Sequence, residues 1–315
     1  MTLAEAGNNW IKQVRAEELE ESTIRGYEQI LRLHISPFLG HIKLANLTKP
    51  MVEAFRDKIL TVRSRDMAIR ALLHLKIILK DAKRLGRVGR NVADDVEIKI
   101  KRRERKKVFI PERHDLVAFL NAAMRSSSVL LLAFATILVF TGLRMSEIRG
   151  LTWDEFDFER GLLNVRHRAD FRCVMGAPKT ETSIRSIPLT TSCINALRAW
   201  KAVVASGPTG LVFPSGVNAP RGYANVIRTL YDPLMILAKL MAWKDNKWVH
   251  KFTPHSFRHA AASLWIAQGF SAKQIQTWMG HSSIQITFDL YGHLFALRDS
   301  DPNLMDRVED ALFGR

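Results

Sequence analysis

Apolar side chains recur at helical spacing along the first hundred residues, and residues typical of helix ends separate the runs. Residues 3–17 predict a first helix. Ser22 is placed to cap a second helix, which Pro37 and Gly40 end. Thr48 with Pro50 is expected to begin a third, which runs to about Leu60. The chain therefore begins with a predicted small helical domain.

A fourth helix is expected to begin after Ser64 and to end at Gly86, with two contrasting faces. Its apolar stripe contains Ala68, Ala71, Leu72, Leu75, Leu79 and Ala82. Its other face carries Arg65, Arg70, Lys76, Lys80, Lys83 and Arg84. A charged face is usually only solvated, but charges almost wholly of one sign favour contact with phosphate groups.

The stretch KIKRRERKKVF, residues 99–109, has seven basic residues against Glu104 and few apolar ones. Such a run can be a localisation tag or a flexible tail. Between two globular segments, we expect a linker that follows a nucleic-acid backbone through Lys101, Arg102, Arg103 and Arg105. The predicted organisation is a helical domain over 1–95, a basic linker over 96–109 and a second domain over 110–315.

The second domain begins with two predicted helices, 111–124 and 129–140. The run VLLLAFATILVF in the latter is too short to cross a bilayer and indicates a buried core helix. Short strands are predicted at 161–167, 184–190 and 210–215, with helices again from about residue 224. This pattern predicts a mainly α domain with a small sheet.

Composition narrows the classes of partner. A chain of 315 residues with 47% hydrophobic residues can form two domains with sizeable cores. Its net charge of +16 favours a polyanion, with nucleic acid ahead of an anionic membrane surface, although a basic charge can also serve solubility alone. Cys173 and Cys193 give neither a disulfide framework nor a zinc ribbon, and the first ten residues lack signal-peptide features. We therefore expect a cytoplasmic protein.

The segment TPHSFRHAAASLWIAQG predicts a helix capped by Thr253 and ended by Gly269. His255 and Arg258 are three residues apart and share one face at its start. Taken alone, such a pair is more often an ordinary polar cap than a site.

A second arginine follows the buried helix 129–140. In TGLRMSEIRGLTW, Arg144 begins a new turn and Glu147 lies on the same face. An arginine held at the end of a core helix requires an anion, either an internal carboxylate or a ligand.

Three further candidates lie in other motifs. In APKTETSIRSIPL, Lys179 is in or beside a turn between strands. In SAKQIQTWMGHSSIQITFDLYGHL, a short helix is expected before Gly280, followed by His281 and a helix ending near Tyr291. By itself, Tyr291 would be an ordinary core or surface tyrosine.

Two arginines, two histidines, a lysine and a tyrosine suit phosphoryl transfer at a diester. Arginine forks can hold non-bridging oxygens and stabilise the transition state. A lysine can protonate a leaving alkoxide, and a tyrosine can act as nucleophile. The cations replace a metal ion, so neither a metal nor another cofactor is expected.

In this order, the motifs TGLRMSEI, PKTETSIRSIPL, HSFRH, MGHSS and FDLYGHL resemble those of tyrosine recombinases of the phage integrase family. The resemblance extends over nearly the whole chain. It implies a mainly α fold with a small antiparallel β-sheet: a helical core-binding domain and an α+β catalytic domain that together clamp duplex DNA.

The resemblance also implies a role for each candidate. Arg144 and Arg258 would hold the scissile phosphate, His281 would hydrogen-bond to it, and Glu147 would support the site from behind. Ser146 stands where the family usually has glycine, but it is still a small residue.

For the chemical steps, the resemblance makes Tyr291 the nucleophile that forms a 3′-phosphotyrosyl bond. Lys179 would be the general acid for the 5′-hydroxyl, and His255 the proton acceptor. Such an enzyme integrates or excises a prophage or other mobile element as a homotetramer on paired DNA sites, in some cases with a directionality factor. It would be associated with the bacterial nucleoid.

Other interpretations remain open. A type IB topoisomerase uses similar chemistry, and a non-catalytic DNA-binding protein would share the basic charge. His255 and His259 have the spacing of zinc ligands, but Ser256 stands where a metalloprotease helix needs glutamate. The last residues favour recombination, because an apolar stripe on a short predicted helix could dock on a neighbouring protomer: Leu304, Met305, Val308 and Leu312. We expect no arm-site-binding domain before Ser22.

Overall fold

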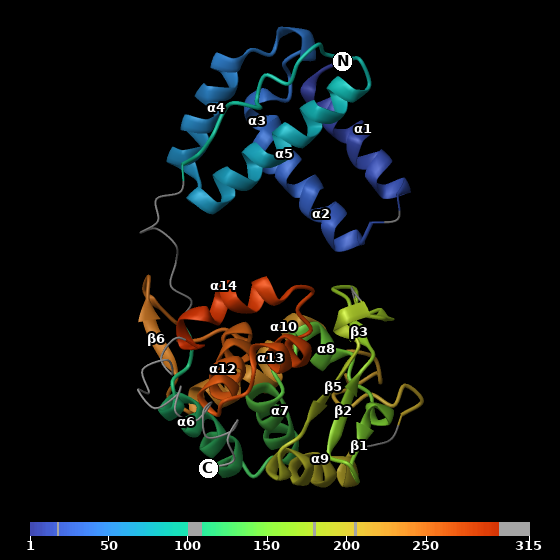
Figure 1. Cartoon of the computed structure of the whole chain (residues 1–315), viewed down its shortest axis with the longest axis vertical. Coiled ribbons are helices and arrows are strands. Elements are labelled where there is room, and N and C mark those ends of the chain that lie inside the picture. Colours follow the sequence, from blue (N-terminus) through green and yellow to red (C-terminus); the bar gives the residue numbers. More distant parts are fainter. Residues whose placement is uncertain (18, 100–108, 179–180, 205–206, 296–315) are drawn as a thin grey trace, which may run out of the picture. The chain divides into compact units, whose positions relative to one another are not determined.

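The computed structural model describes residues 1–17, 19–99, 109–178, 181–204 and 207–295. The chain divides into two compact units, Met1–Lys106 and Lys107–Arg315 (Figure 1). Each unit has its own hydrophobic core. Within the described residues, no helix is both long and apolar enough to cross a membrane.

The first unit is helical. Its elements are α1 (Leu3–Ala16), α2 (Glu21–Ile30), the π-helical turn η1 (Leu31–Ile35), α3 (Ser36–Leu39), the 3₁₀ turn η2 (Leu44–Asn46), α4 (Lys49–Val62) and α5 (Arg65–Arg84). The four predicted helices are present. The prediction that Ser22 caps the second helix was wrong. Ser22 lies inside α2, and its hydroxyl donates to Glu20 Oε2 at 3.2 Å.

Helix α5 has the two faces that the sequence predicts. The Ser64 hydroxyl accepts the Met67 backbone N–H at 3.3 Å, and the whole apolar stripe is buried. On the basic face, Arg65 and Lys76 donate to the carbonyls of Lys99 and Asp94 at 2.6 and 2.8 Å. These bonds hold the segment after α5 against the helix, and Val96, at the start of the segment predicted as the linker, is buried in the same core. The remaining basic residues of this face, Arg70, Lys80, Lys83 and Arg84, are exposed.

The second unit is mainly α with small antiparallel sheets. Its helices are α6 (Arg113–Arg125), α7 (Val129–Phe140), α8 (Met145–Arg149), α9 (Thr191–Val203), α10 (Tyr223–Val226), the π-helical turn η6 (Ile227–Tyr231), α11 (Asp232–Leu237), α12 (Pro254–Ala267), α13 (Ala272–Met279) and α14 (Ile284–Phe295), with 3₁₀ turns η4 (Trp153–Glu155) and η5 (Glu181–Ser183). Its strands are β1 (Phe156–Asp157), β2 (Leu162–Val165), β3 (Arg168–Ala169), β4 (Met175–Gly176), β5 (Arg185–Pro188), β6 (Met241–Lys244) and β7 (Lys247–His250). The main sheet has the order β1-β2-β5, with Leu163 opposite Ile187.

Three sequence-based expectations for this unit were wrong. Residues 210–215 form only isolated bridges, such as that between Leu211 and Thr152, and not a strand. The helices expected from residue 224 are interrupted by the β6–β7 hairpin, whose turn residues Asp245 and Asn246 have φ of 49° and 59°. Helix α14 continues to Phe295 and does not end near Tyr291.

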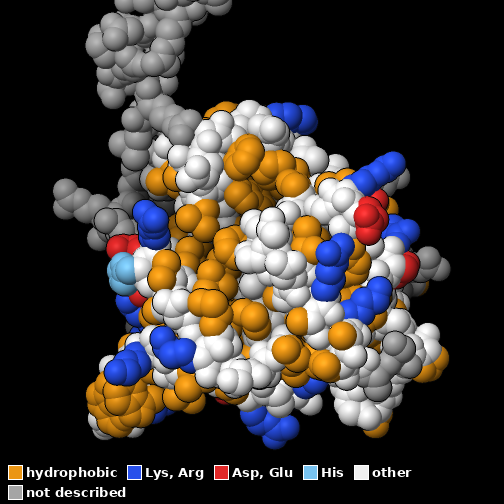
Figure 2. Space-filling model, turned by 90° about the horizontal axis from the view of Figure 1, so that it is seen from below, with side chains coloured by type: hydrophobic (Ala, Val, Ile, Leu, Met, Phe, Trp, Pro, Cys, Tyr) orange, Lys and Arg blue, Asp and Glu red, His pale blue; other side chains and the backbone are white. Residues whose placement is uncertain are grey.

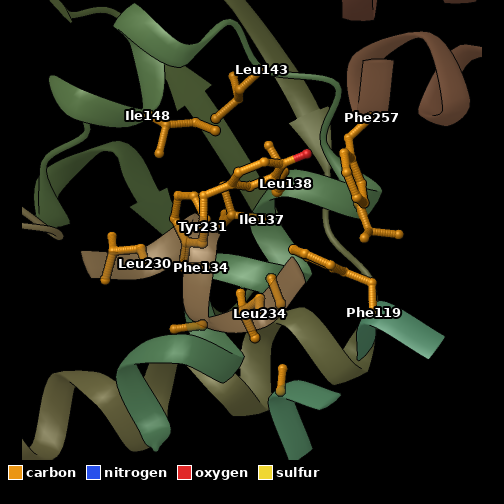
Figure 3. Packing of buried hydrophobic residues seen from close by; sticks show 14 of the residues in the cluster. Phe119, Phe134, Ile137, Leu138, Leu143, Ile148, Leu230, Tyr231, Leu234 and Phe257 are labelled. Atoms are coloured by element: carbon orange, nitrogen blue, oxygen red, sulfur yellow. The ribbon is translucent and has the colours of Figure 1, made fainter. Parts of the chain in front are cut away.

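Helix α7 is the centre of the second core. It packs against α6, α9 and α12, and its residues Phe134, Ile137 and Leu138 lie among aromatic side chains from other helices (Figure 3). The nearby Tyr231 hydroxyl donates to the Phe252 carbonyl at 2.8 Å, just before α12 begins. This packing fixes the end of α7 relative to the start of α12. The unit's surface in Figure 2 mixes hydrophobic side chains with Lys and Arg, and acidic ones are few.

Candidate active site

Arg258 is fixed one turn into α12. The Thr253 hydroxyl caps this helix by accepting the Ser256 N–H at 3.3 Å, and Pro254 occupies its first turn. The Arg258 guanidinium is buried and donates to the carbonyls of Gly142 and Met279. Arg258 therefore ties α12 to the loop after α7 and to the end of α13.

Arg144 is the N-cap residue of α8. Its Nη1 donates to Glu147 Oε1 at 2.9 Å, and its Nη2 donates to the Gly280 carbonyl at 2.9 Å. Its backbone N–H donates to Glu147 Oε2 at 2.7 Å. The side chain stays 36% exposed, so it is held at one end and open to a ligand at the other.

Arg185 is a third arginine of the site. It belongs to the motif PKTETSIRSIPL, but it was not predicted from the sequence as a site residue. It lies on β5, where inward and outward positions alternate, and its side chain is only 1% exposed. Two parallel bonds of 3.0 and 2.9 Å join its guanidinium to the Glu147 carboxylate. It also donates to the carbonyls of Trp278 and Ser183 at 2.6 and 2.8 Å. The only sign in the sequence that Arg185 belongs to the site was its inward position on a predicted strand.

The site has an excess of positive charge. Three guanidinium groups surround the Glu147 carboxylate. Burial raises the pKa of Glu147, but Arg185, Arg144 and Arg258 outweigh it and hold that pKa below its usual range. Burial, reinforced by Arg144, lowers the pKa of Arg258 to about 9. An anionic ligand would offset both the repulsion among these arginines and the cost of burying the Arg258 charge.

Tyr291, on α14, is fully buried. Its hydroxyl lies 2.7 Å from His259 Nδ1, a contact that the sequence did not predict, because His259 was considered only as a zinc ligand. Burial raises the pKa of Tyr291 to about 12. Burial, with His255 and Arg258 nearby, lowers the pKa of His259 to about 4, so this imidazole is neutral at physiological pH.

The two other histidines lie on opposite sides of Arg258 in sequence. His281, just after α13, is buried, and its Nδ1 lies 3.0 Å from Thr287 Oγ1. Burial, with Arg258 and Arg144 nearby, lowers the pKa of His281 to about 4. His255 is exposed, and desolvation and the same arginines lower its pKa. Both rings can therefore act as neutral hydrogen-bonding groups.

A cavity of about 380 Å³ brings these side chains together. It is lined by Arg144, Glu147, His255, Arg258, His259, His281 and Tyr291, among others. Pro178, which precedes Lys179, also lines it. Lys179 itself lies outside the described residues, as do Lys101, Arg102, Arg103 and Arg105 of the linker and the apolar stripe after residue 300.

Comparison with protein families gives two matches. Residues 112–298 match the phage integrase family, and residues 2–60 match the phage integrase N-terminal SAM-like domain.

Among curated proteins, an integrase of Streptomyces ambofaciens is 28% identical, over 92% of this chain and 76% of its own length. The ICEBs1 integrase of Bacillus subtilis is 25% identical, over 90% of this chain and 76% of its own length. The transposase of transposon Tn916 from Enterococcus faecalis is 30% identical, over 50% of this chain and 40% of its own length.

The fold is shared with solved integrase structures. The Tn1549 transposon integrase in complex with circular intermediate DNA aligns with a TM-score of 0.78 at 21% identity, covering 98% of this chain and 100% of that one. Lambda integrase bound to DNA aligns with a TM-score of 0.68 at 17% identity, covering 96% and 99%.

Proposed function

The chain belongs to the phage integrase family and is a tyrosine-type site-specific recombinase, and we propose that it cuts and rejoins duplex DNA through a covalent 3′-phosphotyrosyl intermediate. Its biological role in this proposal is to integrate or excise a mobile element. The observation that carries the proposal is the cavity in which Arg144, Arg258 and Tyr291 meet.

In this proposal the scissile phosphate binds between Arg144 and Arg258, because that cavity has an excess of positive charge. Each guanidinium holds a non-bridging oxygen and stabilises the charge that builds up in the transition state. His281 donates a further hydrogen bond, and His255, on the exposed rim of the cavity, also hydrogen-bonds to the phosphate. Glu147 does not touch the phosphate but orients Arg144.

In the cleavage step, Tyr291 Oη forms a bond to phosphorus while the bond from phosphorus to O5′ breaks. The leaving O5′ takes a proton from Lys179, which we propose as the general acid. The diester becomes a phosphotyrosyl ester of similar energy, so the free 5′-hydroxyl of another strand can reverse the step. No metal ion is needed to balance it.

DNA binding in this proposal involves both units. DNA is the ligand in the integrase complexes that share this fold. The exposed residues of the basic face of α5, such as Arg70 and Lys80, contact the phosphate backbone, and the basic linker follows it between the core-binding domain (1–95) and the catalytic domain (110–315). We propose a homotetramer on paired sites, assembled through the residues after 300, with a directionality factor as a further partner.

Covalent capture tests this function. The protein is incubated with nicked duplexes whose central sequence is randomised, and adducts that survive denaturation are isolated and sequenced. The wild type should give an adduct to a defined set of sequences. Tyr291→Phe should give none and still bind duplex DNA, because only the hydroxyl is removed. Tyr223→Phe, at an exposed tyrosine on α10, should behave as wild type. An adduct with Tyr291→Phe would exclude Tyr291 as the nucleophile.

A further inference from the structure

The phenolic hydroxyl of Tyr291 already has a partner in the DNA-free protein. Among the described residues its hydrogen bond is to His259 Nδ1, at 2.7 Å, and not to His255. Both side chains are buried, with exposed fractions of 0% for Tyr291 and 8% for His259. Water therefore competes little for the phenolic proton, and the nearest base is this imidazole.

Resting on the proposed function, we propose that His259 is a further catalytic residue, the group that accepts the Tyr291 proton during cleavage and returns it during rejoining. Its position on α12 suits both tasks. Arg258, the residue directly before it, holds the phosphate, so one rigid helix presents the anion site and the base to the same cavity. Tyr291 comes from α14, which packs against α12.

The step balances in atoms and charge. The O–H bond of Tyr291 breaks and its proton moves to His259 Nδ1, while the oxygen lone pair forms the bond to phosphorus. The bond from phosphorus to O5′ breaks, and O5′ takes the Lys179 proton. The catalytic domain gains one positive charge at His259 and loses one at Lys179, so its net charge is unchanged.

The groups around His259 explain why its imidazole is neutral before DNA binds. The titratable and charged groups around it are His255 and Arg258 on its own helix, His281 in the loop after α13, and Tyr291 on α14. The cations disfavour a protonated imidazole in the empty site. A bound phosphodiester brings a negative charge to Arg258, and this makes His259 more basic when the attack occurs.

His259→Asn separates proton acceptance from positioning. An asparagine oxygen can occupy the place of Nδ1 and accept the same hydrogen bond, but it cannot take the proton. We measure single-turnover adduct formation at pH 7–9 on a duplex selected by covalent capture. A 5′-bridging phosphorothiolate is used, because its thiolate leaves without a proton and the result is independent of Lys179.

We expect His259→Asn to form adduct about 10²–10⁴-fold more slowly at pH 7. Its rate should rise about tenfold per pH unit, because Tyr291 must then give its proton to hydroxide. The wild-type rate should change little over this range. His114→Asn, at an exposed position on α6, should match the wild type.

Two results would overturn the assignment: a His259→Asn rate close to wild type, or a reduced rate with the wild-type pH dependence, which marks a positioning role. Thermal unfolding and duplex binding of the variant show whether it is folded. His259→Gln, which moves the amide away from the hydroxyl, should be at least as slow as His259→Asn if the base assignment is right. If the wild type itself forms no adduct, the proposed function fails, and not this assignment alone.

Discussion

At the scale of single residues, Glu147 organises the site although it is buried behind it. Its two oxygens accept four hydrogen bonds, three from guanidinium groups of Arg144 and Arg185 and one from the Arg144 backbone. Removing one partner of a buried ion pair leaves an uncompensated charge and typically costs about 3–5 kcal/mol.

Glu147→Gln should therefore lower the free energy of unfolding of the catalytic unit by about 3–5 kcal/mol, measured by denaturant unfolding at pH 7. Glu159→Gln, at an exposed residue, should change it by less than about 0.5 kcal/mol. Adding Arg185→Met to Glu147→Gln should recover part of the loss, because no buried Arg185 guanidinium then lacks its carboxylate. An equal loss in both Glu variants would refute this account.

The lowered pKa of Glu147 also predicts how the free energy of unfolding depends on pH. The pKa of Glu147 is lower in the folded protein than its ordinary value, so the charged carboxylate stabilises the fold above the unfolded pKa, about 4.3. This contribution disappears as the pH falls through the lower, folded value. The stability difference between wild type and Glu147→Gln should thus be constant at neutral pH and shrink below about pH 4.

Sequence patterns identified residues whose neighbours are close along the chain. Arg144 with Glu147, and His255 with Arg258, are three residues apart, and helical spacing alone places them on one face. His259 and Tyr291 are 32 residues apart, and Arg185 and Glu147 are 38 apart. Only tertiary packing brings such residues together, and for this reason these two contacts were missed.

At the scale of elements, the end of α13 is the connection on which the site depends. Gly280 ends this helix with φ 62° and ψ 47°, and its carbonyl accepts Arg144. A Cβ at this position would lie 3.2–3.3 Å from the Arg185 side chain, which its bonds to Glu147 hold in place. Glycine satisfies both the backbone conformation and the close approach.

Gly280→Ala should lower the stability of the catalytic unit by about 1–2 kcal/mol and slow adduct formation, since the strained turn carries a hydrogen-bond acceptor of Arg144. Gly26→Ala in α2 is the matched control. No atom lies within 4 Å of its added Cβ, so a better helix former should raise the stability of the first unit by about 0.5–1 kcal/mol. Calorimetry of the full chain can follow both transitions. Unchanged stability in Gly280→Ala would contradict the strain.

Most helices could be predicted, because caps and apolar stripes are local features. Helices α5 and α12 begin directly after Ser64 and Thr253, as the sequence indicates. The hairpin β6–β7 was missed because its exposed Trp243 and Trp248 lack the usual alternation of a half-buried strand. The apolar residues 211–213 are buried but do not form a strand, because the chain bends at residues 212 and 213 and pairs only through isolated bridges.

At the scale of the whole molecule, the basic linker predicts how binding depends on salt. Replacing Lys101, Arg102, Arg103 and Arg105 by glutamine should weaken binding to unrelated duplexes alike. It should flatten the slope of log K against log salt by about one unit for each phosphate that the linker no longer neutralises. Exchanging Lys for Arg and Arg for Lys at these positions conserves charge and should keep the slope. If the glutamine variant keeps the wild-type slope, the linker does not contact DNA.

The residues after 300 predict a role in assembly. Deleting 301–315 should spare binding of one protomer to a half-site and weaken cooperative filling of the second, because Leu304, Met305, Val308 and Leu312 would otherwise dock on a neighbour. Gel shifts with half-sites and full sites measure this. Thermal unfolding without DNA is the control: a large fall in melting temperature with cooperativity intact would show that the tail covers its own domain.

The hydrophobic core of the first unit shares no residue with the hydrophobic clusters of the second unit. In evolutionary terms, selection can therefore change the packing of one unit with little effect on the packing of the other. Substitutions on the surface of α2 or α5 leave unchanged the packing of α7 that supports Arg144 and Arg258. The first hundred residues can thus drift or be exchanged while the core that supports the two arginines is inherited intact.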